Sequence, residues 1–165
     1  YIYERWLAPF HGGFAPASTS QTFTAGRVLM AEFSVPQTRT VDRICYIVGA
    51  TSNGNVTVGI YGPVTTTETS TGVTLLVQSS STAQGTANSS QCITVSDTVI
   101  TAGTYYVALE GSSATGTYMR QTNQEQIVGW GAFYNRGGGY GTLTTPAPTT
   151  TDTSSAIPSM KIRLK

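Results

Sequence analysis

The sequence predicts an all-β domain, an antiparallel β-sandwich of the jelly-roll type with about eight strands. Three observations lead to this prediction. Thr, Val, Ile and Tyr favour strands, and Ser, Asn and Gly favour the turns between them. Short apolar runs alternate with a period of two and are separated by Gly, Pro and Asn. No segment carries a helical apolar stripe longer than two turns, and no repeat of fixed period indicates a solenoid.

The length of 165 residues fits one domain. Residues 1–26 are predicted to be an irregular, aromatic N-terminal arm, and residues 27–165 the sandwich. The aromatic residues of the arm are Tyr1, Tyr3, Trp6, Phe10 and Phe14. Such an arm would be poorly soluble if it were free, so we expect it to pack either on its own sandwich or on a neighbouring subunit. It is therefore a candidate partner interface.

The first predicted strand is Val28–Val35, which Pro36 ends. Its core-facing residues are predicted to be Ala31, Phe33 and Val35, and its outward-facing residues Glu32 and Ser34. The second strand is Val41–Val48. It is predicted to turn Ile44, Tyr46 and Val48 to one face and Arg43 and Cys45 to the other.

The dipeptide Asn53-Gly54 predicts a type I′ hairpin, because this turn needs two residues with positive φ. The strand Val56–Tyr61 follows and ends at Gly62-Pro63. The remaining predicted strands are Val73–Gln78, Cys92–Val95, Tyr105–Glu110, Thr117–Arg120, Ile127–Tyr134 and Ile157–Leu164. In Tyr105–Glu110, the inward-facing residues are expected to be Tyr105, Val107 and Leu109.

The two cysteines, Cys45 and Cys92, are predicted to be free thiols. A disulfide needs Cα atoms about 5.5 Å apart. The strands that carry the cysteines are the second and fifth by this assignment, and a standard jelly-roll order places those strands at opposite edges of one sheet. A bridge between them would therefore refute that strand order.

Charge and apolar runs exclude two classes of partner. The net charge is +1, and the only close basic cluster, Lys161, Arg163 and Lys165, is predicted to be a solvated strand face. Proteins that bind nucleic acid usually neutralise several phosphates, so we expect no nucleic acid partner. No run approaches the ~18 apolar residues that span a bilayer, so we expect no membrane insertion.

The ionisable residues predict no enzyme, no cofactor and no metal site. His11, the only histidine, lies in the arm, and one histidine cannot build a site of several histidine ligands. A catalytic triad would need this residue. Glu32 and Glu110 fall on outward phases of predicted strands, where two carboxylates in principle share a face. We interpret them as ordinary solvent-facing positions.

The candidate ligand-facing residues are loop aromatics, namely Tyr118, Trp130 and Tyr140. Exposed aromatic rings stack on sugars and anchor protein interfaces. Core packing is the alternative for Trp130, which shares a strand phase with Tyr134. Tyr140 lies between glycines and is the one expected to be exposed.

Three segments carry a family resemblance, namely Phe33–Pro36 followed by Val41–Ile44, Asn55–Tyr61, and Ile100–Leu109. In order and spacing, residues 28–110 resemble the jelly-roll β-sandwich modules of bacteriophage virion and tail-fibre proteins. The resemblance implies an extracellular domain on the virion surface, often oligomeric, for host attachment or particle decoration.

We therefore expect a non-enzymatic virion structural protein. Its partners would be other virion subunits in a homo-oligomer, with a trimer favoured, and a host-surface glycan would be a further partner. The alternative is a carbohydrate-binding module of a secreted or cell-surface protein.

Overall fold

The computed structural model describes residues 5–7, 19–24, 26–64, 73–120, 131–135, 140–144 and 158–165. For 5–7 and 131–135 the description is of the backbone alone. Within these ranges the chain is all-β, its strands pair antiparallel, and it has no helix. The described residues accordingly contain no helix that is long and apolar enough to cross a membrane.

The larger sheet has six strands, in the order β11-β3-β9-β5-β6, with the short strand β7 also paired to β5. Their bounds are Arg27–Val35 for β3, Asn55–Tyr61 for β5, Leu75–Gln78 for β6, Thr82–Ala83 for β7, Gly103–Gly111 for β9 and Gly131–Asn135 for β11. β9 is central, with β3 along one side and β5 along the other.

The second sheet has four strands, in the order β1-β12-β4-β8. Their bounds are Arg5–Leu7 for β1, Arg39–Ile47 for β4, Ser90–Ile100 for β8 and Met160–Leu164 for β12. A third, two-stranded sheet pairs β10 (Thr117–Arg120) with β2 (Thr19–Thr22). It joins the four-stranded sheet through a bridge between Val48 and Tyr118.

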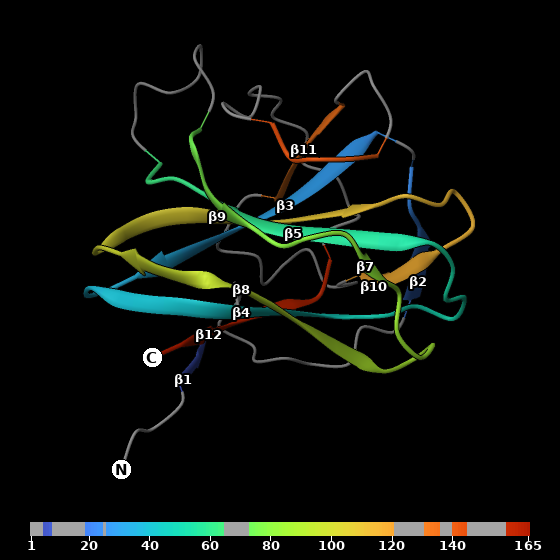
Figure 1. Ribbon diagram of the computed structural model, residues 1–165, viewed down its shortest axis with the longest axis horizontal. Helices are drawn as coiled ribbons and strands as arrows, with labels where there is room; N and C mark the ends of the chain where they lie inside the picture. Colours follow the sequence, from blue (N-terminus) through green and yellow to red (C-terminus); the bar gives the residue numbers. More distant parts are fainter. Residues whose placement is uncertain are drawn as a thin grey trace.

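The main hydrophobic core lies between the two larger sheets, which form the layers seen in Figure 1, with β3, β9 and β5 in one and β4, β8 and β12 in the other. The larger sheet contributes side chains such as Leu29, Val58 and Val107, and the four-stranded sheet contributes Ile44 and Ile162. Fully burying an aliphatic side chain of this size stabilises a protein by about 1.5–3 kcal/mol. The arrangement is therefore sandwich-like, held together by its apolar interior.

A second apolar cluster covers part of the outer face of the larger sheet. Its buried members are Val28, Met30, Tyr61, Val73, Ala108 and Leu143. For this reason β3 does not alternate at its start, where Val28 and Met30 are as buried as Leu29 and Ala31. The outer face of this sheet therefore packs against other parts of the chain.

The predicted strand phases are confirmed where the structure describes them. The residues expected to face inward lie in the main core, namely Ala31, Phe33, Val35, Ile44, Tyr46, Val48, Tyr105, Val107 and Leu109. The strand Thr117–Arg120 has the predicted bounds. The strand predicted at Cys92–Val95 is part of the longer β8.

The hairpin predicted at Asn53-Gly54 is wrong. β4 and β5 belong to different sheets, so the segment between them crosses the sandwich instead of joining neighbouring strands. Of the two residues only Gly54 has a positive φ, at 77°, whereas a type I′ turn needs two. Turn residues indicate where the chain changes direction but do not choose the partner of the next strand.

The prediction of free thiols is also wrong. Cys45 and Cys92 face each other across β4 and β8, with their Cα atoms 4.0 Å apart, and form a disulfide. The sequence assignment omitted β1, which precedes every predicted strand. The strands that carry the cysteines are therefore not the second and fifth, and they are neighbours in one sheet.

The described parts of the N-terminal arm are not irregular. β1 pairs with β12, placing the backbone of Trp6 opposite Arg163, and β2 pairs with β10. Phe23 enters the main core and contacts Tyr118, with ring centroids 5.0 Å apart. These stretches pack on their own chain, whereas Tyr1, Tyr3, Phe10 and Phe14 lie outside the described residues.

Candidate functional site

Residues 140–144 cross the outer face of the larger sheet and build one wall of a pocket. Hydrogen bonds to β5 and β6 hold them there. The hydroxyl of Tyr140 lies 2.8 Å from the hydroxyl of Thr57 on β5. The backbone N–H of Leu143 donates to Oε1 of Gln78 on β6 at 2.9 Å. The hydroxyl of Tyr61 donates to the carbonyl of Thr144 at 3.1 Å.

Gly59 allows this close approach. A Cβ atom at position 59 would lie 2.6 Å from Cδ1 of Leu143 and 2.9 Å from the carbonyl oxygen of Val77. Both distances are shorter than normal packing permits, and one of the two atoms belongs to the backbone. The absence of a side chain at Gly59 thus lets Leu143 pack against β5 and fixes the height of the segment above the sheet.

The pocket has a volume of about 320 Å³ and an uncharged, mostly hydroxyl-bearing lining. Its lining residues are Thr57, Gln78, Ser79, Ser80, Ser81, Tyr140, Gly141 and Thr142. Ser80, Ser81 and Thr142 are exposed, whereas Thr57 and Ser79 are buried at the base. The volume is at the small end of the ~300–1,000 Å³ that ligand pockets occupy.

The hydroxyl groups of Thr57, Tyr140 and Ser81 form a directed series of hydrogen bonds in the pocket. Tyr140 donates to Oγ of Ser81 at 2.8 Å. Because a tyrosine hydroxyl has a single hydrogen, the contact between Thr57 and Tyr140 must then be donated by Thr57. The chain therefore runs from Thr57 through Tyr140 to Ser81, and the hydrogen of the Ser81 hydroxyl is directed elsewhere. Such chains polarise their members and hold each hydroxyl in one orientation.

The structure places two of the three candidate aromatic residues, and in different surroundings. Tyr140 lies in the pocket wall and is half-buried. Tyr118 is a correction, because only 1% of its surface is exposed and it packs in the core beside Phe23. Burial raises the pKa of its hydroxyl. A residue so placed cannot face a ligand. Trp130 lies outside the described residues.

The two glutamates share a face, as their phases predict, but they do not form a catalytic pair. Glu32 lies opposite Tyr106, and Glu110 lies opposite Val28, so four residue positions separate them along the sheet. At the usual rise per residue, their backbone positions lie about 14 Å apart along the sheet. Paired carboxylates in glycosidases lie closer together than this. Glu110 is fully buried, which also contradicts its interpretation as a solvent-facing residue. Partial burial raises the pKa of Glu32.

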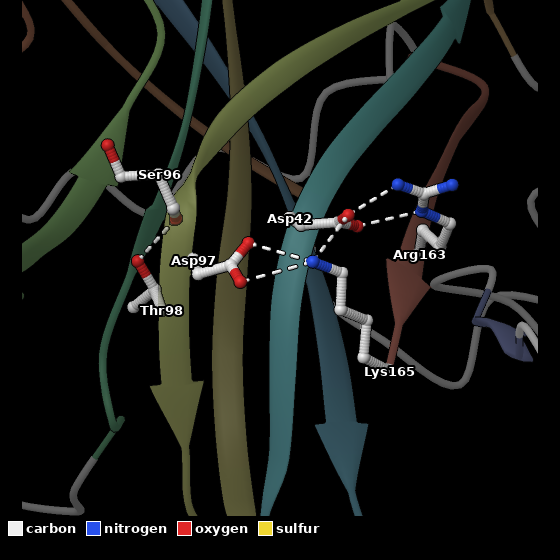
Figure 2. A network of polar contacts seen from close by, with 6 residues as sticks. All are labelled: Asp42, Ser96, Asp97, Thr98, Arg163 and Lys165. Atoms are coloured by element: carbon white, nitrogen blue, oxygen red, sulfur yellow. Dashed lines mark hydrogen bonds and ion pairs between the residues drawn. The ribbon is translucent and has the colours of Figure 1, made fainter. Parts of the chain in front are cut away.

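A cluster of charged residues lies on the outer face of the four-stranded sheet (Figure 2). The guanidinium of Arg163 on β12 donates two hydrogen bonds to the carboxylate of Asp42 on β4, one from Nε at 2.8 Å. Nζ of Lys165 lies 3.2 Å from the same carboxylate and 3.0 Å from that of Asp97 on β8. The hydrogen bonds from Arg163, followed by those from Lys165, lower the pKa of Asp42 to about 2.

The charged cluster occupies an irregularity in the sheet. The register between β4 and β8 shifts between Val41 and Arg43, and that between β12 and β4 shifts at Arg163 and Leu164. Asp42 therefore lies at a bulge between β8 and β12. The positive charges of Arg163 and Lys165 neutralise its carboxylate. The expectation that Arg163 is solvated is wrong, since only 13% of its side chain is exposed. We interpret this cluster as a structural clamp.

No metal site emerges from the described ranges, where no three His, Cys, Asp or Glu side chains are grouped closely enough to hold an ion. His11 lies outside these ranges. The sequence matches no protein-family model, and the search of curated proteins finds no match. The resemblance to phage modules therefore rests on the sequence pattern alone.

Sequence reasoning identified Tyr140 but missed the other residues of the pocket. Ser79, Ser80 and Ser81 belong to a Ser- and Thr-rich stretch after β6 that reads as an ordinary loop. Thr57 reads as an outward strand position. Only the fold brings Thr57 and Ser81 within hydrogen-bonding distance of Tyr140, some 60 to 80 positions later in the chain.

Proposed function

We propose that this chain is a non-enzymatic, extracellular structural domain that serves as a virion-surface subunit in assembly, decoration or host attachment. The observation that carries the proposal is the disulfide between Cys45 and Cys92 across β4 and β8. Disulfides persist in oxidising surroundings such as virion and cell surfaces and are rare in the cytosol. A low charged fraction, 10% of the residues, agrees with a subunit packed among neighbours.

The strand order supports a jelly roll. In a jelly roll of eight strands, the first, eighth, third and sixth form one sheet, and the second, seventh, fourth and fifth form the other. When β7 and β11 are set aside and β1, β3, β4, β5, β6, β8, β9 and β12 are counted in chain order, the orders β1-β12-β4-β8 and β3-β9-β5-β6 match this pattern. The same fold is expected from the resemblance to phage modules, but a fold by itself does not establish a function.

The chemistry of the described residues favours binding over catalysis. The described lining of the pocket contains no carboxylate, histidine, lysine or cysteine, so these residues offer no strong general base or activated nucleophile. The two glutamates on the same sheet face are too far apart to act together. In the charged cluster on the four-stranded sheet, Asp42 pairs with Arg163 and Asp97 pairs with Lys165.

The assembly role is supported by the edge of the four-stranded sheet. β8 is its terminal strand, and among the described residues only β4 pairs with it. Val99 on this strand has 65% of its surface exposed, more than any other large apolar residue whose side chain the structure describes. Edge strands present backbone groups that pair readily with another chain. We expect a homo-oligomer, with a trimer favoured.

Particle labelling tests the proposed location. An antibody raised against the chain is expected to label intact virions purified from the source culture, without permeabilisation. Protein that is found only in the particle-free supernatant would instead favour the alternative, a carbohydrate-binding module of a secreted protein. Label confined to the host cytosol would overturn both assignments.

Native mass measurement tests the assembly role. The wild-type chain is expected to form a trimer that Val99→Lys dissociates, because a charge on the exposed edge of β8 opposes strand pairing. Ser34→Lys is the matched control, since Ser34 is exposed on the other sheet. A wild-type chain that stays monomeric at high concentration would argue against assembly through this chain.

A further inference from the structure

We propose that the pocket lined by Thr57, Ser79–Ser81 and Tyr140 binds one uncharged sugar unit of a glycan. This inference deepens the proposed role in host attachment and rests on it for the biological setting. The chemistry of the pocket itself would be the same in any extracellular domain.

The described lining favours an uncharged ligand over a charged one. An anion such as phosphate or a carboxylate sugar needs an arginine, a lysine or a row of free backbone N–H groups. No charged side chain is among the described residues that line the pocket, so an anion would find no such cation on them. A metal cation would need carboxylates, which the lining also lacks. The remaining class of polar ligand is neutral.

The same residues suit a ligand whose groups both donate and accept hydrogen bonds. Hydroxyls of serine, threonine and tyrosine act in both roles, as do the hydroxyls of a sugar. Ser81 accepts from Tyr140 and retains its own hydrogen for donation. Gln78 uses Oε1 to hold the backbone of Leu143, which fixes the amide and leaves its NH₂ group as a positioned donor.

The arrangement of the pocket is already fixed without a ligand. Tyr140 is held between Thr57 and Ser81, so neither its ring nor its hydroxyl has to be ordered on binding. Its neighbour Gly141 adds no side chain that would cover the ring of Tyr140, which is half-buried. A rigid aromatic ring beside hydroxyls matches a sugar, which presents apolar C–H groups on one face and hydroxyls around its rim.

The volume limits the size of the bound unit. At about 320 Å³ the pocket accommodates a small ligand, and the exposed Ser80, Ser81 and Thr142 place its mouth in solvent. We therefore expect one sugar residue to enter while the rest of the glycan stays outside. Few contacts of this kind give weak affinity, in the millimolar range for a single unit.

The first test measures binding of the whole chain to immobilised neutral glycans, with sialylated and sulfated glycans on the same surface for comparison. The second is an NMR titration of the chain with free neutral monosaccharides. Ser81→Ala and Tyr140→Phe are each expected to lower the affinity by about three- to tenfold, because each variant removes one of the hydrogen-bonded hydroxyls in the pocket. Ser34→Ala is the matched control, since Ser34 lies on the same sheet outside the pocket lining. Denaturation midpoints identify any variant that is not folded.

Saturable binding of neutral glycans that both variants weaken and Ser34→Ala leaves unchanged would support the site. The proposal is overturned if no neutral glycan binds, if the folded variants bind as the wild type does, or if charged glycans bind in preference. Particle labelling is independent of this result. Labelled virions without glycan binding would remove the sugar site and leave the structural role, whereas glycan binding by a chain absent from virions would do the reverse.

Discussion

The outer faces of the two larger sheets use polar residues in opposite ways. On the four-stranded sheet, Asp42 and Asp97 are matched by Arg163 and Lys165, and a disulfide lies on the same face. On the larger sheet, a hydrogen-bonded chain of neutral hydroxyls lines a pocket that opens to solvent. These four charges are paired within the chain, whereas the proposed site on the second face offers hydroxyl and amide donors to a ligand.

Under the proposed assignment, the more highly charged cluster is structural and the neutral pocket is the binding site. Strong charge-assisted bonds hold three adjacent strands in register at a bulge, where the backbone ladder is interrupted. Neutral hydroxyls form weaker bonds and exchange them more easily for those of a ligand. The two faces should therefore respond differently to substitution, in stability on one side and in binding on the other.

The largest effect is expected from the disulfide. Cys45→Ala combined with Cys92→Ala should lower the free energy of unfolding by about 2–4 kcal/mol, because the bridge closes a loop between distant residues. Urea denaturation with and without dithiothreitol checks this prediction. Reductant should destabilise the wild type by a similar amount and leave the double variant unchanged. Equal stability of the two proteins without reductant would show that the bridge is not formed in solution.

The next largest effect is expected from Asp42→Asn, which should lower the free energy of unfolding by about 2 kcal/mol. This figure follows from the pKa of the Asp42 carboxyl, which is about 2 in the folded state against an ordinary value of 3.8. Because the folded-state pKa is lowered, the contribution is complete above about pH 4 and is lost as the pH falls towards 2. Denaturation curves between pH 2 and pH 7 should show this loss in the wild type and less of it in the variant.

Asp97→Asn is the matched control for that experiment. Asp97 makes an ion pair with Lys165, but 64% of its side chain is exposed, so its removal should cost less than about 1 kcal/mol. An equal cost for the two substitutions would contradict the distinction between a buried and an exposed member of the clamp.

A smaller effect on stability, about 1–2 kcal/mol, is expected from Gly59→Ala, because the added methyl group collides with Leu143 and with the backbone at Val77. The segment 140–144 should move away from the sheet, and binding at the pocket should weaken more than the loss of stability alone implies. Gly85→Ala is the control, since a Cβ atom there meets its nearest neighbour at 3.4 Å. Unchanged binding by Gly59→Ala would separate the pocket from the position of Leu143.

Much of the sandwich could be predicted from local pattern. The period-two alternation in β4 and β9 placed Ile44 and Tyr46, and Val107 and Leu109, in the core correctly. The pattern failed at Val28 and Met30, because apolar residues on both faces of β3 are explained only by a covering segment far along the chain. It also failed for β1, since three residues within an irregular aromatic stretch carry too little periodicity to identify a strand.

By itself the sequence determined which segments are extended and which side chains turn inward, because both depend on neighbouring residues and on the pleat of a strand. Only the tertiary structure decided which strands are neighbours, since pairing depends on how the chain crosses from one sheet to the other. That choice brought Cys45 to Cys92, gave Asp42 two positive partners, and placed Tyr140 between Thr57 and Ser81. The candidate site therefore follows from the strand order, which the local sequence pattern does not predict.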